Sequence, residues 1–232
     1  MAAPSLYLSG LVQRRALAER TALASASNKL PTTTREKTTR DVDAQKQAAR
    51  RSARARRRAA ATSSPPDAPQ AAARRLMERP PRPLACRVAG YWPAKSEFDA
   101  RPVLAALMEI GATILLPRLE LSAERRMSFR LFDGSEDTLE DGPFGLRQPR
   151  ADAPAVVPDL ILAPLLAFDR RGGRLGQGGG DYDRTIAALR ERRAPMLVGL
   201  AYAAQEVDAV PSEPHDQCLD WIATERGLIS CR

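Results

Sequence analysis

The sequence predicts an α/β fold, a single three-layer domain in which helices flank a mostly parallel sheet. Short apolar segments typical of buried strands alternate with amphipathic segments from residue 84 to the C-terminus, an order that favours parallel strands joined by helices. The 232 residues, 44% of them hydrophobic, suffice for one domain with a substantial core. The chain carries no internal repeat and no apolar run near the roughly 18 residues that span a bilayer.

The N-terminal part differs in composition from this core. Residues 1–40 are rich in Ala, Ser, Thr and charge and poor in aromatic residues, so we expect a disordered extension. Residues 42–60 consist mostly of strong helix formers. Four basic residues recur there at helical spacing and share one face: Lys46, Arg50, Arg54 and Arg57. A solvated basic face is the simpler interpretation of this pattern, and an anion-binding face is the alternative.

The elements that follow are predicted in order from composition and periodicity. The Ser- and Pro-rich segment 61–69 predicts a linker, and a short helix is expected over residues 70–78. Apolar segments predict strands at residues 84–90, 113–116, 127–132, 159–162 and 195–200, helices at 101–110 and 181–193, and a hairpin at 168–175. Gly111 is expected to end the helix before it.

Composition restricts the function classes. Residues 1–83 hold 18 Lys/Arg against 6 Asp/Glu, and residues 84–232 hold 18 against 22, so the folded body is mildly acidic. A nucleic-acid-binding domain carries its basic patch on the folded part, so no nucleic acid partner is expected.

The cysteines and the histidine limit the metal chemistry. No zinc-like spacing relates Cys86, Cys218 and Cys231, and a reducing compartment, the cytoplasm, is expected. The single histidine, His215, excludes multi-histidine metal centres.

The most informative segment is the glycine-rich loop Arg174–Asp183, which precedes the predicted helix 181–193. Glycines at alternate positions can turn successive amides toward one point. Such amides beside a helix N-terminus suit phosphate. Asp183 would then be placed to hold the Mg²⁺ that accompanies a nucleotide. A flexible surface hairpin is the alternative, and neither the P-loop nor the dinucleotide fingerprint fits this spacing.

Several further segments carry a resemblance that extends from Lys46 to the C-terminus. They are Ala89-Gly90-Tyr91-Trp92-Pro93 with Ser96-Glu97, Gly142-Pro143-Phe144-Gly145-Leu146, Ala167-Phe168-Asp169 leading to Arg174-Leu175-Gly176 and Tyr182-Asp183-Arg184, and Glu213-Pro214-His215-Asp216 with Leu219-Asp220. In this order and spacing they resemble the 5-formyltetrahydrofolate cyclo-ligase family, also called 5,10-methenyltetrahydrofolate synthetases. The resemblance implies a fold like that of sugar-phosphate isomerases and CoA-transferases.

The resemblance also implies an activity. The formyl oxygen of 5-formyltetrahydrofolate, polyglutamylated forms included, would be phosphorylated by Mg-ATP. N10 would then attack, and loss of phosphate would yield 5,10-methenyltetrahydrofolate and ADP. Because phosphoryl transfer depends on positioning and charge stabilisation, few reactive side chains are needed. A cytoplasmic monomer without a membrane partner is expected. The implied domains are a disordered extension, 1–40, and a cyclo-ligase domain, 41–232, comprising a basic ATP-contacting helix (41–60), a linker (61–69) and an α/β core (84–232).

The resemblance assigns roles to particular residues. Arg174 and Asp183 would be catalytic, and Asp183 and Asp216 would be the Mg²⁺ carboxylates. ATP would contact Lys46, Arg50, Arg174, Leu175, Gly176, Gln177, Gly178, Gly179, Gly180, Asp181 and Tyr182. The folate would contact Trp92, Glu97, Gln177, Gly178 and Tyr182, with Glu97 paired to the donor groups of the pterin and Trp92 forming an apolar wall.

Each assignment has a structural alternative. The simpler interpretations are that Glu97 faces solvent, that Asp216 caps a following helix and that Trp92 is an ordinary core residue. Asp181 occupies a position where the family has an aromatic residue or histidine, and a carboxylate there would repel phosphate unless it points outward. The loop also lacks the lysine of many members, which makes the basic helix more important here.

Two other functions compete with the enzyme. The first is a non-catalytic folate- or nucleotide-binding relative whose basic N-terminus contacts nucleic acid. Single-strand-binding arms usually interleave aromatic residues, and Tyr7 is the one aromatic residue before residue 88. The second is an isomerase or CoA-transferase-type enzyme, which would act without ATP.

Overall fold

The structure is a computed structural model that describes residues 32–80, 86–120 and 127–231. The disorder expected for residues 1–31, and the first two residues of the strand expected at 84–90, lie outside the described residues. Contacts within the chain define two units, Met1–Ala44 and Gln45–Arg232. The sheet and the candidate site belong to the second unit.

The first described helix, α2, spans Thr32–Ser63. Residues 32–40 are therefore helical where we expected disorder. Neither proline nor glycine occurs from residue 32 to 64, and Arg, Lys, Gln, Glu and Ala favour helix throughout. The helix ends ahead of Pro65 and Pro66, and α3 begins at Ala68, so the linker expected over residues 61–69 is reduced to four residues. Helix α3 spans Ala68–Glu78, with Pro69 in its first turn, where proline is tolerated.

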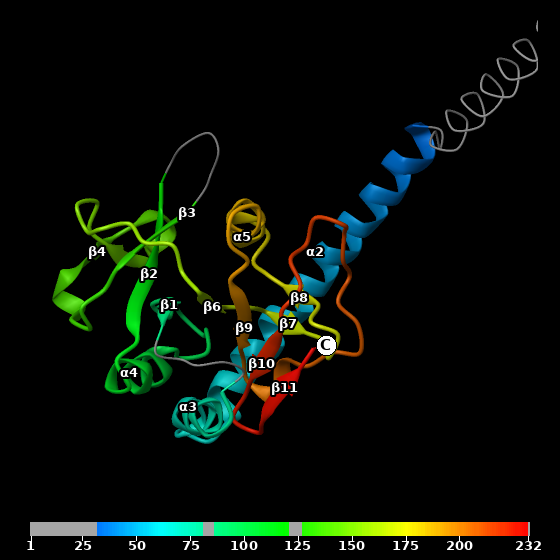
Figure 1. Ribbon diagram of the computed structural model, residues 1–232. Coiled ribbons are helices and arrows are strands. Elements are labelled where there is room, and N and C mark those ends of the chain that lie inside the picture. Colours follow the sequence, from blue (N-terminus) through cyan, green and yellow to red (C-terminus); the bar gives the residue numbers. More distant parts are fainter. Residues whose placement is uncertain (1–31, 81–85, 121–126, 232) are drawn as a thin grey trace, which may run out of the picture. The chain divides into compact units, whose positions relative to one another are not determined.

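A seven-stranded sheet forms the centre of the second unit, in the order β11-β10-β9-β6-β1-β2-β3 (Figure 1). The strands are β1 (Arg87–Ala89), β2 (Thr113–Leu119), β3 (Met127–Leu131), β6 (Leu160–Ala163), β9 (Met196–Leu200), β10 (Trp221–Ala223) and β11 (Leu228–Ser230). The five inner strands pair in parallel, and the edge strands β3 and β11 are antiparallel to their neighbours. The mostly parallel sheet is therefore confirmed.

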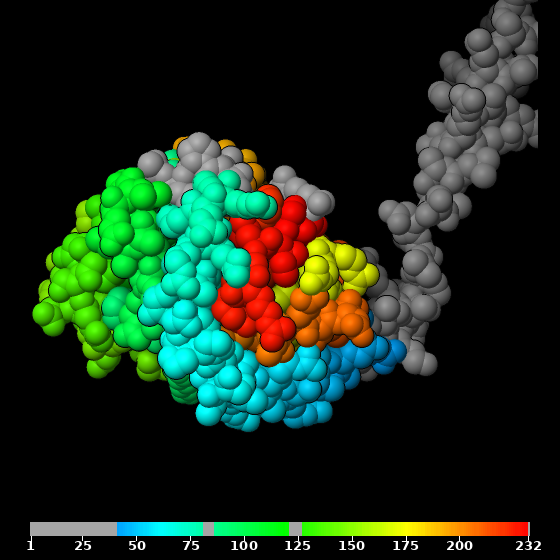
Figure 2. Space-filling view, turned by 90° about the horizontal axis from the view of Figure 1, so that it is seen from below, coloured from blue at the N-terminus to red at the C-terminus, as the bar shows by residue number. Residues whose placement is uncertain are grey.

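Alternate residues of the inner strands place helices on both faces. Val88 packs in one cluster with Leu76 of α3 and Leu104 of α4, which spans Arg101–Glu109. The next residue, Ala89, packs in the opposite cluster with Ile186 of α5, which spans Asp181–Arg190. Figure 2 shows α3 (cyan) beside the C-terminal strands β10 and β11 (red), which it contacts. Three layers result, as the sequence predicts.

Smaller elements lie outside the main sheet. β7 (Ala167–Phe168) and β8 (Arg174–Leu175) form the predicted hairpin. β4 (Leu139–Asp141) and β5 (Arg147–Pro149) form a second antiparallel pair. Within the described ranges, three 3₁₀ turns complete the elements: η1 (Glu136–Thr138), η2 (Pro143–Gly145) and η3 (Ala203–Gln205). In the part of the chain that the structure describes, no helix is both long and apolar enough to cross a membrane.

The boundaries of the predicted helices are close to those observed. Helix α4 ends at Glu109, and Gly111 follows with φ of +84°, the left-handed conformation in which glycine ends helices. Helix α5 begins at Asp181 as expected and ends at Arg190, three residues before the expected end.

We expect Ile186 to hold α5 against the sheet. The side chain is fully buried, in the same cluster as Ala89. Ile186→Ala should lower the free energy of unfolding by about 2–5 kcal/mol, and Ile186→Val by about 0.5–1.5 kcal/mol, measured by urea unfolding. Equal losses for the two variants would show that this contact is not made.

Candidate functional site

The glycine loop connects β8 to α5. Gly178 and Gly180 have φ of +106° and +70°, values that L-residues with side chains rarely adopt. Gly180 is the N-cap of α5 and contributes no side-chain cap. The first amides of α5 therefore face outward beside the loop, the arrangement that binds anions at helix N-termini.

Helix α2 packs on this loop with its basic face. Ala53 of α2 is buried in a small cluster with Leu166, Leu175 and Val210. Arg50 then donates from Nε to the Gly176 carbonyl oxygen (3.3 Å). A Cβ placed on Gly178 would lie 3.3 Å from the Arg50 guanidinium carbon, so the guanidinium lies directly over the glycine.

The other basic residues of this helix face also contact the rest of the protein. Arg54 donates to the Gln177 side chain and to its carbonyl oxygen, both at 3.2 Å. Lys46 and Arg57, at the two ends of the basic face, are each only 5% exposed. The interpretation of this face as solvated is therefore wrong.

Lys46 contacts two carboxylates from the C-terminal part of the chain. Its Nζ lies 2.7 Å from Glu213 Oε2 and 2.6 Å from Asp216 Oδ2. Burial acts to lower the pKa of the ammonium, but the hydrogen bonds to Asp216 and Glu213 outweigh it, and the pKa lies above its ordinary value. The resemblance assigned Asp216 but not Glu213, although Glu213 belongs to the same motif.

Arg174 and Asp183 form a second ion pair. Arg174 Nη2 lies 2.8 Å from Asp183 Oδ1, and the Arg174 side chain is 4% exposed. Its guanidinium also lies over the Tyr182 ring, 5.6 Å from the centroid. The amide of Gln217 donates to the same Asp183 oxygen (3.0 Å). Because Gln217 directly follows Asp216, the segments that carry the two expected metal ligands are in contact.

The carboxylates of Glu213 and Asp216, which contact Lys46, have the chemistry of cation ligands. The ligand atoms of Glu213, His215 and Asp216 lie within 4.8 Å of one another, and the ammonium of Lys46 lies between the two carboxylates. Carboxylates that converge on a positive group fit the donor set that Mg²⁺ prefers. Asp216 caps no following helix, because the described chain continues to β10 without one. His215 is largely exposed.

Glu97 occupies a buried position at the other end of the basic face. Its Oε1 lies 3.5 Å from Arg57 Nη1, and the two side chains are 12% and 7% exposed. Its Oε2 accepts from the Ala94 amide (3.1 Å). Burial raises the pKa of the Glu97 carboxyl, while the Ala94 amide and Arg57 oppose the rise. The interpretation of Glu97 as a solvent-facing residue is therefore wrong.

Three buried donors around this region have no hydrogen-bond partner among the described residues: Arg57 Nε, Arg174 Nε and Tyr182 Oη. Burial raises the pKa of the Tyr182 hydroxyl, and the Glu97 charge raises it further, so these two groups lie within electrostatic range. Buried polar atoms normally have partners. Unsatisfied donors of this kind are available to a polar ligand.

Trp92 packs against the protein interior and also lies near the candidate substrate-binding residue Glu97 in the sequence. Trp92 packs against the main core, contacts Phe132 edge-to-face (centroids 5.6 Å apart) and has the Arg101 guanidinium 5.7 Å above its ring. It is thus partly a core residue, as its simpler interpretation states.

Asp181 is paired with a base. Its carboxylate lies 2.7 Å from Arg184, so its negative charge beside the loop is compensated.

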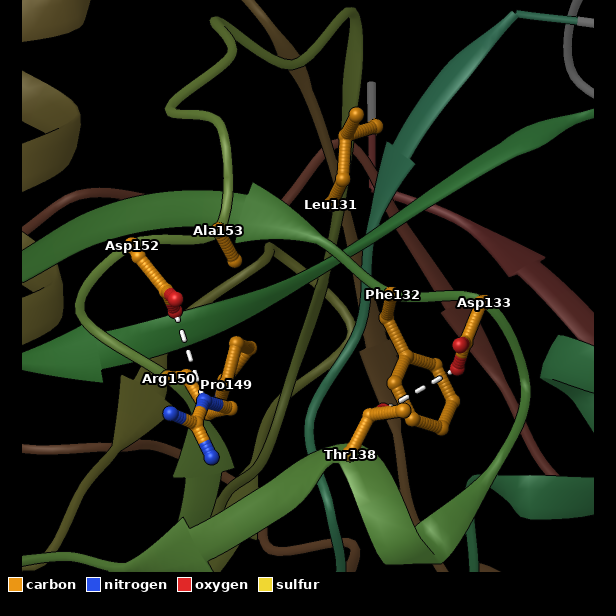
Figure 3. Close-up of a pocket in the computed structure, with 8 residues that line it drawn as sticks. All are labelled: Leu131, Phe132, Asp133, Thr138, Pro149, Arg150, Asp152 and Ala153. Carbon is orange, nitrogen blue, oxygen red and sulfur yellow. Dashed lines mark hydrogen bonds and ion pairs between the residues drawn. The ribbon is translucent and has the colours of Figure 1, made fainter.

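A pocket elsewhere in the molecule does not belong to this site. It has a volume of about 310 Å³ and is lined by residues of β3, β5 and the adjoining loops. Figure 3 shows that its polar groups pair with each other, Asp133 with Thr138 and Arg150 with Asp152. We assign it no ligand.

Most of the chain is similar to proteins of one family. The model of the 5-formyltetrahydrofolate cyclo-ligase family matches residues 42–225. The chain is 33% identical over 154 residues to the 5-formyltetrahydrofolate cyclo-ligase of Mycolicibacterium smegmatis, covering 62% of this chain and 77% of that protein. It is 31% identical over 156 residues to the enzyme of that name from Escherichia coli K12, covering 66% and 85%.

Solved structures agree with these matches. The NMR structure of Aquifex aeolicus 5,10-methenyltetrahydrofolate synthetase superposes with a TM-score of 0.61 at 27% identity, covering 81% of this chain and 93% of that one. The synthetase from Mycoplasma pneumoniae has a TM-score of 0.57 at 21% identity, covering 78% and 98%. The second likeness supports the fold alone.

Two glycine substitutions test the loop geometry. Gly178→Ala should lower the free energy of unfolding by about 1–2 kcal/mol, because a Cβ is strained at positive φ and would meet Arg50. Gly176→Ala is the matched control, since Gly176 has no left-handed φ and a Cβ there would make only an ordinary contact, 3.4 Å from Arg174 Nη1. Urea unfolding measures both, and equal effects would contradict the loop conformation.

Proposed function

The chain belongs to the 5-formyltetrahydrofolate cyclo-ligase family, and from this premise we propose that it closes the ring of 5-formyltetrahydrofolate with Mg-ATP. The γ-phosphoryl group passes to the formyl oxygen, and ADP leaves. N10 then attacks the activated carbon, and loss of phosphate gives 5,10-methenyltetrahydrofolate. The observation that carries this proposal is the docking of Arg50 and Arg54 of α2 on the glycine loop.

The glycine loop and α2 would hold the triphosphate. Arg50 already lies over Gly178, where it can contact phosphate oxygens together with the amides of residues 175–182. Arg174 begins the same loop and Lys46 lies one helical turn before Arg50, and both are paired with carboxylates. On nucleotide binding these two cations would exchange their carboxylate partners for phosphate oxygens, which stabilises the charge that develops during phosphoryl transfer.

The carboxylates released by this exchange are the proposed metal ligands. Asp183 and Asp216 would hold Mg²⁺, and Glu213, which shares Lys46 with Asp216, lies close enough to assist. Mg²⁺ supplies charge neutralisation on the phosphate oxygens. The ion pairs of Lys46 and Arg174 compensate these buried charges. Nucleotide and metal would replace both partners of each pair, so that no charge is left buried and unpaired.

The folate would bind at the Glu97 end of the site. A buried carboxylate matches the guanidine-like donor edge of a pterin, as carboxylates match arginine. Trp92 would supply an apolar wall, and Gln177, Gly178 and the unpartnered hydroxyl of Tyr182 would contact the substrate beside the loop. The Glu97 end of the site and the glycine loop would thus be connected through Tyr182 and Arg174, because the Arg174 guanidinium lies over the Tyr182 ring.

The remaining properties are also proposals. The catalytic domain would comprise α2 from about residue 41, the short connection to α3, and the α/β core from residue 84. A cytoplasmic monomer is expected. The inward orientation of Lys46 and Arg57 disfavours the nucleic-acid-binding alternative, because a nucleic acid would need these charges on the surface.

Absorbance of the methenyl product tests the function. Purified full-length protein with 5-formyltetrahydrofolate and Mg-ATP should form the methenyl chromophore, and omission of ATP or addition of EDTA should prevent it. Turnover without ATP would favour the isomerase or CoA-transferase interpretation. A folded sample that forms no product under any condition would contradict the proposal.

Asp183→Asn tests the metal site. The amide keeps an acceptor near Arg174, which is necessary because removal of the side chain would leave this buried guanidinium unpaired. Turnover should fall about 100-fold, with a higher Mg²⁺ requirement. Glu191→Gln, at the exposed C-terminal end of α5, removes one charge from the same helix and should leave turnover unchanged. Equal turnover of the Asp183 variant and wild type would disprove the ligand assignment.

A further inference from the structure

Arg57 is the one residue of the basic face that contacts neither the glycine loop nor the acids of residues 213–216. Its guanidinium instead reaches Glu97, with Nη1 3.5 Å from Oε1. No assigned role in phosphate binding accounts for this residue, and yet Arg57 is only 5% exposed. Because an isolated buried guanidinium is costly, its contact with Glu97 requires an explanation.

Both side chains of the pair are largely buried, and the other titratable groups that act on them are mainly tyrosines. The groups that act electrostatically on Glu97 or on Arg57 are Tyr91 of the loop after β1, Tyr182 of α5, Tyr202 before η3, and Arg54 of α2. The Tyr91 hydroxyl donates to the Phe98 carbonyl oxygen (2.8 Å), and burial raises its pKa. The tyrosines are thus neutral at pH 7, and Arg57 is the one cation in contact with Glu97 among the described residues.

This pairing has a direct effect on Glu97. Burial raises the pKa of the carboxyl, and the Arg57 charge works in the opposite direction. Without the guanidinium, desolvation would act on Glu97 with only the Ala94 amide opposing it. A protonated Glu97 offers one acceptor oxygen fewer to the donor edge of a pterin.

We propose that Arg57 is a positioning residue that holds Glu97 as a correctly oriented anion for the folate, an inference that rests on the proposed function of Glu97. The Arg57 Nε, buried and without a hydrogen-bond partner among the described residues, offers an additional donor to the same ligand. Through α2, the phosphate end and the pterin end of the site then belong to a single helix: Arg50 lies on the glycine loop and Arg57, two turns further on, orients the folate-binding acid.

The titration of Glu97 tests the proposal without any substrate. The ¹³C signal of its side-chain carboxyl, assigned with Glu97→Gln, is followed with pH in the full-length wild type and in Arg57→Met. Loss of an adjacent opposite charge should raise the pKa of Glu97 by about one to three units. An unchanged titration midpoint would overturn the proposal. Arg57→Gln, which keeps a donor without the charge, replaces Arg57→Met where the latter does not fold.

Kinetics separate positioning from a general structural role. In Arg57→Met, KM for 5-formyltetrahydrofolate should rise about tenfold or more, and the acidic limb of kcat/KM should move to higher pH, because Glu97 must be ionised to bind. KM for Mg-ATP should stay within about twofold of wild type. Arg57→Lys should restore the pH profile. Arg58→Met, which removes the neighbouring exposed charge, should behave as wild type.

The outcomes distinguish this proposal from the proposed function. A rise in both KM values would show that Arg57 only anchors α2 and would overturn the proposal. Wild-type protein that forms no methenyl product would contradict the function, whereas the carboxyl titration would still decide whether Arg57 controls Glu97.

Discussion

The site depends on the docking of a helix that has almost no apolar face. From Gln45 to Ser63 the only hydrophobic residue type in α2 is alanine, and burial of alanine methyl groups contributes little. Small side chains such as Ala53 instead let the helix backbone approach closely, and Lys46 and Arg57 are almost fully buried. The charged ends of these side chains find their partners in Glu213, Asp216 and Glu97. The cations that hold α2 in place are therefore largely those proposed to bind the substrates.

This dual use explains the arrangement of charge in the site. Each buried cation on the proposed phosphate side, Lys46 and Arg174, is paired with a carboxylate that is also a proposed metal ligand, so the charges compensate each other. A buried ion pair contributes little net stability when its desolvation is counted, so exchange of its partners for phosphate and metal is feasible at modest cost. The proposed folate end differs, because Arg57 and Glu97 are proposed to act on the same substrate group and would stay paired when it binds.

The sequence predicted the features that local pattern determines. The helices starting at Arg101 and Asp181, the buried strands β6 and β9, and the hairpin before the glycine loop all have periodicity or glycine signals of their own. Three-residue strands such as β10 and β11 are too short to show a period. The partner of Lys46 could not be read from any window, because Glu213 lies 167 positions away. Glu97 was assigned through the resemblance, but its burial beside Arg57 depends on tertiary packing alone.

The ion pairs of Lys46 join one of the first ordered turns of the second unit to a loop near the end of the chain, 167 and 170 positions later. During synthesis on the ribosome, α2 leaves the exit tunnel long before Glu213 and Asp216 are translated. This basic segment of α2 therefore remains without these carboxylate partners until residues 213–216 have been made, and the proposed nucleotide site assembles only then. A nascent chain stalled before this loop would contain the glycine turn and most of the sheet, and would still lack the contacts that neutralise Lys46.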